Sequence, residues 1–219
     1  MKVVLAGYRA WALESFVSVI NRFPEIEFIV VKNPKDLQHH TDSIVLGAGW
    51  SWIFPSEFLK DNKVVALMHP SALPNYAGGS PIQHQIIDGV TSSQATLFKV
   101  VTKIDAGPIL YQEPISLCGH IEDVFNELKK ATEKLFVRFL LDYPEVREVE
   151  QRYLSPARKR LKPADSRLTS ALLERMSCEE LYNFIRCRED PYPNVYIEDD
   201  AGKLLIKRAV YIKKEDDLK

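Results

Sequence analysis

The N-terminal third of the chain alternates between short apolar runs and stretches with helical spacing. Four short apolar runs predict buried strands, at 3–6, 28–31, 43–46 and 64–68. Between the first two runs, apolar residues recur every three or four positions, as in a helix that packs one face on a sheet: Ala12, Phe16, Val19, Ile20 and Phe23. Strand, helix and strand in this order favour a parallel α/β sheet.

The pattern changes after residue 80. A short helix is predicted at 82–87. Two strands at 95–101 and 109–117, joined by a tight connection, should then add to the sheet in antiparallel fashion. A long amphipathic helix follows, with an apolar face formed by Ile121, Val124, Phe125, Leu128, Thr132, Leu135, Phe136 and Phe139.

The chain becomes polar and basic after Pro144, which indicates a boundary in the fold. We interpret 1–144 as the main domain, 145–163 as a linker and 164–219 as a small C-terminal α+β module.

Two local signals define the structure of this module. Ser177 and Glu180 have the spacing of a capping box, which predicts the start of a helix. Two strands at 195–197 and 204–210 flank a polar turn and predict a hairpin.

Composition limits the class of partner. The chain has 219 residues, of which 46% are hydrophobic and 27% charged, and its net charge is -1. Proteins that grip a nucleic-acid backbone concentrate cations on one face and are basic overall, so we expect no nucleic-acid partner. The one basic cluster is interpreted as a solvated turn between the domains, and consists of Arg158, Lys159, Arg160 and Lys162.

The sequence predicts a cytoplasmic protein without a membrane partner. Tyr8 and Arg9 interrupt the apolar start before a secretory signal could form. The longest apolar stretch, 44–54, is far short of the roughly 20 residues that span a bilayer. The cysteines are widely spaced and are expected to be reduced packing residues, at Cys118, Cys178 and Cys187.

Two polar residues lie where an open α/β sheet usually binds its ligand, beyond the carboxyl ends of the strands. His69 directly follows a predicted strand, in a loop stiffened by prolines and opened by Gly78 and Gly79. Asp105 lies in the turn between the two antiparallel strands. Taken singly, a structural histidine and an ordinary turn aspartate explain these two residues at least as well as a catalytic role does.

Together the two loops match a known family. The stretch HPSALPNYAGGSPIQ at 69–83 and the stretch IDAGPIL at 104–110 resemble the signature loops of the folate-dependent formyltransferases. That family includes methionyl-tRNA, glycinamide-ribonucleotide and sugar-amine formyltransferases, and the resemblance covers about 1–142. It implies an α/β fold with a Rossmann-like, mostly parallel sheet of the formyltransferase type. It also implies that His69 and Asp105 are the catalytic residues.

The resemblance further implies 10-formyltetrahydrofolate as cosubstrate, bound in an apolar slot near 47–54. The residues expected to bind it are Trp50, Ser51, Trp52, Ile53 and Asp105. The alternative is that these aromatic side chains belong to the core. No dinucleotide or P-loop motif occurs, and the adjacent His39 and His40 lack the spacing of zinc ligands, so no metal is expected.

One position departs from the family pattern. The family usually places an asparagine two residues before the histidine, where it binds the formyl oxygen, and this chain has Leu67 there. Losing one such donor typically costs about 2.7–4 kcal/mol of transition-state stabilisation. Candidate substitutes are Gln83, Lys99 and Asn75.

The acceptor is predicted from the same resemblance. The strand region 97–117 and the tail segment 180–193 are most similar to the sugar-amine branch, which implies a small-molecule acceptor, an amino deoxysugar linked to a nucleotide. The residues expected to bind it are Asn75, Gly78, Gly79, Gln83, Lys99, Arg186 and Tyr192.

Alternatives stay open at this point. Leu67 is compatible with a non-catalytic folate or sugar-nucleotide binding module on the same scaffold. Methionyl-tRNA and glycinamide-ribonucleotide formyltransferase are the other catalytic alternatives. The sequence leaves open the sugar, the nucleotide, the amino position, and whether the chain is a monomer or a homodimer.

Overall fold

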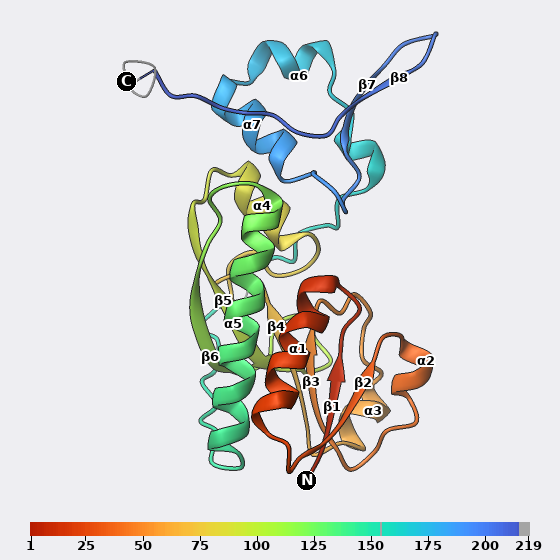
Figure 1. Cartoon of the computed structure of the whole chain (residues 1–219), viewed down its shortest axis with the longest axis vertical. Coiled ribbons are helices and arrows are strands. Elements are labelled where there is room, and N and C mark those ends of the chain that lie inside the picture. Colours follow the sequence, from red (N-terminus) through yellow and green to blue (C-terminus); the bar gives the residue numbers. More distant parts are fainter. Residues whose placement is uncertain (154, 215–219) are drawn as a thin grey trace.

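A six-stranded sheet forms the centre of the molecule (Figure 1). The structure is a computed structural model, and it describes residues 1–153 and 155–214. The strands lie in the order β2-β1-β3-β4-β5-β6. Their bounds are β1 (Lys2–Ala6), β2 (Glu27–Val31), β3 (Ile44–Ala48), β4 (Val64–His69), β5 (Ser92–Lys99) and β6 (Ile109–Ser116).

The direction of the strands agrees with the sequence. Strands β1 to β4 are parallel, and β5 and β6 are antiparallel to their neighbours. The predicted α/β fold with a mostly parallel sheet is therefore confirmed. The strand order reverses between β1 and β3, and such a switch point leaves a crevice beyond the carboxyl ends of the two strands. Strand β3 extends past its predicted end because Gly47 and Ala48 pair with β4.

Both faces of the sheet are covered, because successive strand residues point to opposite sides. Val3 of β1 shares one core with helices α1 (Ala10–Arg22) and α5 (Ile121–Asp142), which lie side by side on this face (Figure 1). Val4 packs on the other face with Phe58. Burial on both faces explains why the strands are continuous apolar runs. In the described part of the chain no helix is both long and apolar enough to cross a bilayer.

The predicted short helix before β5 is present as α4 (Pro81–Ile87). Other short helices were not predicted, because four to six residues are too few for an apolar period to emerge. Two of these helices begin at a side-chain N-cap. The Asn33 side chain accepts from the Asp36 amide, and Thr169 accepts from the Leu172 amide. The unpredicted helices are α2 (Pro34–Leu37), α3 (Ser56–Lys60), the 3-10 helix η1 (Pro163–Ser166) and α6 (Ser170–Arg175).

The C-terminal part has a small core of its own, formed by Leu168, Phe184, Ile185 and Val195. Ser177 and Glu180 make the predicted capping box. The hairpin is present, but its second strand is shorter than predicted. Its last pair joins Ile206 to the first residue of the other strand, so the chain beyond has no partner in this hairpin. The remaining elements are α7 (Cys178–Arg186), β7 (Val195–Glu198) and β8 (Lys203–Ile206).

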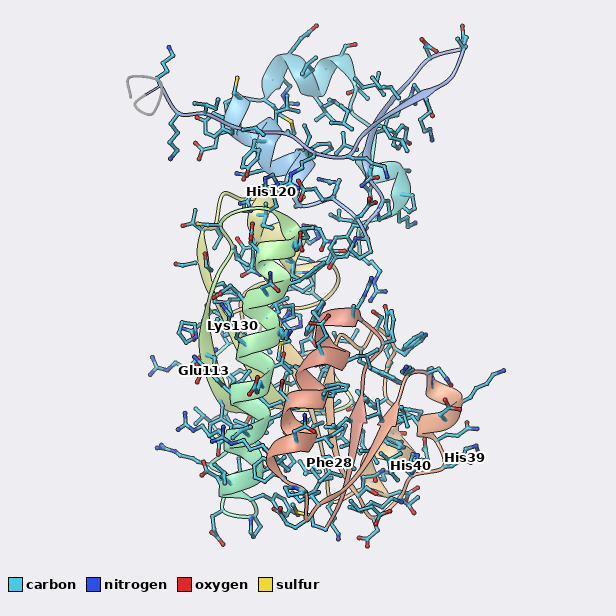
Figure 2. All side chains as sticks on the ribbon, in the orientation of Figure 1. Phe28, His39, His40, Glu113, His120 and Lys130 are labelled. Carbon is cyan, nitrogen blue, oxygen red and sulfur yellow. The ribbon has the colours of Figure 1, made fainter. Side chains whose placement is uncertain are left out.

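Buried polar contacts fix the C-terminal part to the start of α5. Arg186 donates to the carbonyl oxygen of Leu117 at 2.7 Å. Glu189 contacts His120 Nδ1 at 2.7 Å and accepts from the Ile121 amide at 3.1 Å. Figure 2 shows His120 at the end of α5 that faces the C-terminal helices. The carboxylate of Glu189 therefore caps α5 from outside the helix.

The three cysteines differ in exposure. Cys187 is buried, whereas Cys118 and Cys178 are exposed, and all three are free thiols. The expected packing role therefore applies to Cys187 and is wrong for the other two. Burial raises the pKa of the Cys187 thiol to about 11.

A thiol-specific reagent should distinguish these environments. We expect DTNB to label Cys118 and Cys178 in the native protein and Cys187 only after denaturation, because the thiolate is the reactive form and needs access. Absorbance counts the labelled thiols, and peptide mass mapping identifies them. Labelling of Cys187 at the rate of the other two in native protein would contradict this assignment of the core.

Candidate active site

His69 is the last residue of β4, and its ring is almost fully buried. The ring has an acceptor at each nitrogen: Nε2 lies 2.9 Å from the carbonyl oxygen of Tyr76, and Nδ1 lies 3.5 Å from Oδ2 of Asp105. A ring with a proton on each nitrogen satisfies both acceptors.

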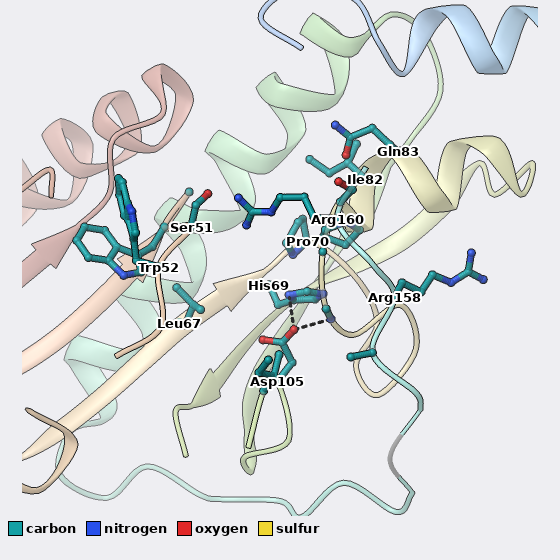
Figure 3. Close-up of a pocket in the computed structure, with 18 of the residues that line it drawn as sticks. Ser51, Trp52, Leu67, His69, Pro70, Ile82, Gln83, Asp105, Arg158 and Arg160 are labelled. Atoms are coloured by element: carbon teal, nitrogen blue, oxygen red, sulfur yellow. Dashed lines mark hydrogen bonds and ion pairs between the residues drawn. The ribbon is translucent and has the colours of Figure 1, made fainter. Parts of the chain in front are cut away.

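Asp105 reaches the histidine because its loop folds tightly. Its backbone has a φ of +50°, a conformation that non-glycine residues rarely adopt. Gly107 makes close packing of the loop possible, because a Cβ atom there would collide with the carbonyl oxygen of Lys99. The amide of Gly78 donates to Asp105 Oδ2 at 2.7 Å and ties the two loops together (Figure 3).

This geometry supports proton transfer beside a bound ligand. The side chains of His69 and Asp105 are 7% and 10% exposed, so the pair is screened from bulk water while one edge faces a cavity. In such a setting a carboxylate stabilises a protonated imidazole and fixes the ring orientation. The two residues that were predicted to meet are thus brought together.

The pair lies in the wall of a cavity of about 580 Å³, within the usual size range of small-molecule sites. One end of this cavity is apolar. Trp50 stacks on Phe54 with ring centroids 5.7 Å apart, and Trp52 lies against Trp50 at 4.9 Å. The predicted cosubstrate residues all line this end, namely Trp50, Ser51, Trp52 and Ile53, with Asp105 at its inner limit.

The other end of the cavity is cationic. Arg158 pairs with Asp88 at 2.7 Å. The other cations that line the cavity form no ion pair with a carboxylate among residues 1–153 and 155–214. The cations in the cavity wall are Arg9, Arg158, Arg160, Lys162 and Arg188. The cluster around Arg158 is exposed, as expected for a solvated turn, and three of its members also line the cavity.

Arg188 is the most buried of these cations, with 5% of its surface exposed. Its guanidinium donates to the carbonyl oxygen of Phe184 at 2.9 Å, and burial lowers its pKa. Carbonyl dipoles compensate a buried guanidinium only in part. The arrangement favours an anionic ligand at this end.

Two predicted acceptor residues lie close to these cations. Gln83 and Tyr192 line the cavity, and the Arg9 guanidinium lies 5.5 Å from the centroid of the Tyr192 ring. Packing around Tyr192 raises the pKa of its phenol to about 12, so it stays a neutral donor at physiological pH. Gly78 and Gly79 also line the cavity beside the histidine.

Three predicted acceptor residues lie outside the cavity wall. Asn75 uses its side chain to accept from the Tyr153 hydroxyl at 2.9 Å. Lys99 pairs with Glu148 at 2.7 Å. Arg186 is buried beneath the C-terminal helices, as described above. Each of these side chains is engaged in structural contacts.

Leu67 lines the cavity and packs with Val100 and Phe98. Of the candidate substitutes for the missing asparagine, Gln83 lies in the cavity wall, and Lys99 and Asn75 do not. Arg9 was missed as a site residue, although it follows the carboxyl end of β1 just as His69 ends β4. That shared position was the signal that could have found it.

The sequence was then compared with known families. A sequence profile described as formyl transferase matches residues 31–140, half of the chain, and this range includes both His69 and Asp105. The chain belongs to the formyl transferase family. The expected family, and with it the class of folate-dependent formyltransferases, is confirmed.

Similar sequences are named methionyl-tRNA formyltransferases. The protein of Lactobacillus delbrueckii is 28% identical over 79% of this chain and 55% of its own length. That of Mycoplasmopsis pulmonis is 29% identical over 92% of this chain and 72% of its own length. The chain thus spans about half to three-quarters of the length of these relatives.

Solved structures share the fold. A methionyl-tRNA formyltransferase from Clostridium thermocellum aligns with a TM-score of 0.86 at 23% identity, covering 97% of this chain and 94% of that one. A sugar N-formyltransferase from Shewanella aligns at 0.77 and 18%, covering 98% and 99%. HypX from Aquifex aeolicus, solved with tetrahydrofolic acid, aligns at 0.75 and 14%, covering 94% and 37%.

The close packing at Gly107 gives a test of the loop that carries Asp105. We expect Gly107→Ala to lower the free energy of unfolding by about 1–3 kcal/mol, because the added methyl group displaces the loop from Lys99. Gly202→Ala is the matched control, since no atom lies within 4 Å of a Cβ at that position. Urea unfolding measures both. Equal stability of the two variants would show that the loop is not packed in this way.

Proposed function

We propose that this protein transfers the formyl group of 10-formyltetrahydrofolate to the primary amine of a nucleotide-linked amino deoxysugar. The observation that carries the proposal is the set of features that one cavity combines. Its wall contains the His69–Asp105 pair, an aromatic slot and several cations. A flat conjugated cosubstrate and an anionic acceptor would fill the two ends and meet at the imidazole.

The chemistry needs one proton to move. The amine attacks the formyl carbon, the new carbon–nitrogen bond forms, and the bond between that carbon and the folate nitrogen breaks. The amine loses one proton and the departing folate nitrogen gains one. His69 is placed to relay that proton, and Asp105, 3.5 Å from its Nδ1, is placed to hold the ring. General acid–base help of this kind contributes about 10²–10⁴ in rate.

The apolar end suits a pterin. Its walls are the rings of Trp50, Trp52 and Phe54 on one side and Leu67 on the other. Rings stacked on an apolar slot give large contact area at small entropic cost. The structure of HypX with tetrahydrofolic acid supports a folate ligand on this fold.

The cationic end suits a diphosphate. Arg160 and Lys162 are exposed at the rim, whereas Arg188 lies deep in the wall. Guanidinium groups bind phosphate oxygens in pairs and in fixed geometry. Tyr192, partly buried beside them, offers a ring face for a base or sugar and a neutral hydroxyl. The similarity to the Shewanella sugar N-formyltransferase supports this class of acceptor.

Methionyl-tRNA is a second candidate acceptor. The observation that favours it is the sequence comparison, in which the similar proteins are named methionyl-tRNA formyltransferases. The position of the cations in the wall of one cavity favours the smaller acceptor. A folate-binding module without turnover is the non-catalytic alternative, which Leu67 supports.

Formyl transfer is tested by the release of tetrahydrofolate. We expect release with a panel of nucleotide-linked 3-amino and 4-amino deoxysugars, confirmed by a mass gain of one formyl group on the product. His69→Ala should lower kcat by about 10²–10⁴ without loss of folate affinity, because the ring acts on the proton and not on the pterin. Folate binding without turnover on any amine, tRNA included, would support the binding module instead.

Substitution of two neighbouring cations, Arg160 and Lys159, distinguishes the two candidate acceptors. We expect Arg160→Ala to raise KM for a nucleotide-linked amino sugar by about 10-fold or more, as for loss of a charged hydrogen bond, while the KM for folate stays unchanged. Lys159→Ala is the matched control, because Lys159 is equally exposed but lies outside the cavity wall. Equal effects of both variants, with tRNA affinity that falls steeply with salt, would favour tRNA.

A further inference from the structure

Gln151 makes an unusual contact with the loop that carries Asp105. Its Nε2 donates to the carbonyl oxygens of both Asp105 and Gly107, each at 2.8 Å. The two amide protons of one side chain thus hold both ends of the turn at residues 105–107. The reversed amide would place Oε1 against two carbonyl oxygens, which fixes the orientation.

The segment around Gln151 is itself anchored to the sheet. Two residues before it, Val149 exchanges backbone hydrogen bonds with Ile109 at the start of β6, at 2.9 and 2.8 Å. This pairing fixes the position of Gln151 relative to the loop of Asp105. The region interpreted from sequence as a linker is therefore attached to the catalytic domain at this point.

The same segment reaches the loop of His69. The amide of Arg158 donates to the carbonyl oxygen of Ala77 at 2.8 Å, and the amide of Gly79 donates to that of Arg158 at 2.8 Å. A Cβ on Gly78 or Gly79 would collide with the backbone of this segment, which shows how closely it is packed. The segment that carries Gln151 and Arg158 therefore contacts both the loop of His69 and the loop of Asp105.

The first part of the loop that carries Asp105 has few packing contacts. Residues 101–104 are exposed, with Ile104 54% exposed, so few apolar contacts fix their place. Asp105 also holds a φ of +50°, which persists only where neighbouring contacts impose it. Without the glutamine, the hydrogen bond from Gly78 and the packing of Gly107 against Lys99 would be left to keep the carboxylate beside the ring.

We propose that Gln151 is a positioning residue for Asp105: it holds the loop so that the carboxylate lies against His69, and it touches neither substrate. The cavity wall described above contains Asp105 but not Gln151. The side-chain oxygen of Gln151, Oε1, is buried and has no hydrogen-bond partner in the part of the chain that the structure describes. A side chain that leaves its acceptor unsatisfied is placed for its donors.

The first test is kinetic, and it rests on the proposed function. We expect Gln151→Met, similar in length but without donors, to lower kcat about 10- to 100-fold with small changes in KM, as for a misplaced catalytic group. In an Asp105→Ala background the same substitution should have no further effect, because the residue acts through that carboxylate. Full additivity of the two losses would overturn the proposal.

Matched variants separate this role from general destabilisation. Gln38→Met makes the same change at an exposed glutamine of α2's C-terminal end and should leave kcat unchanged. Gln151→Glu keeps shape and polarity but loses the amide donors, and it replaces the methionine variant if that one fails to fold. An active Gln151→Glu enzyme with wild-type kcat would also overturn the proposal.

The second test needs no turnover, so it stands even if the proposed activity is wrong. The amide of Gly78 reports on the carboxylate, because it donates to Asp105 Oδ2. We expect Gln151→Met to accelerate hydrogen exchange of the Gly78 amide in NMR spectra, toward the rate in Asp105→Ala, with β1 amides unchanged. Unchanged exchange at Gly78 would show that Gln151 does not position Asp105.

Discussion

The hydrogen bond from the amide of Gly78 to the carboxylate of Asp105 links the loop after His69 directly to the loop of Asp105. The sheet alone does not bring these groups together, because His69 pairs with Thr96, inside β5, and the loop after β5 must fold back to reach the ring. The fold-back requires a positive φ at Asp105 and a glycine two residues later. The catalytic geometry is thus a property of loops, and the strands supply only its base.

This constraint explains which parts of the structure the sequence could predict. Strands buried on both faces are continuous apolar runs, and the long helix α5 has a strong helical period, so the position of each follows from local pattern. His69 and Asp105 could be paired because both loops carry the residues of a known motif. Short helices such as α3 have too few residues to show an apolar period, and they were not predicted.

Residues placed by long-range contacts could not be found from local pattern. Arg158 and Arg160 occur in a polar stretch that is typical of a solvated turn, and long-range contacts such as the backbone bonds to Ala77 and Gly79 place them in the cavity wall. Gln151 gives no signal at all in the sequence. Net charge is equally uninformative here, because an average of -1 over the chain coexists with a cavity wall rich in cations.

The residues of the site lie in two separate parts of the sequence, and this arrangement bears on which acceptor is used. The residues of the proton transfer lie inside the segment that the family profile matches, at 31–140, whereas four of the five cations lie after it, between 158 and 188. Proteins with different named acceptors can therefore share the first part and differ in the second. In this chain the segment after residue 145 contacts the loop of Asp105 through Gln151 and lines the cavity through Arg160. A change in that segment that alters the cations of the cavity wall would also act on the loop of Asp105, so the cationic wall and the His69–Asp105 geometry are physically coupled.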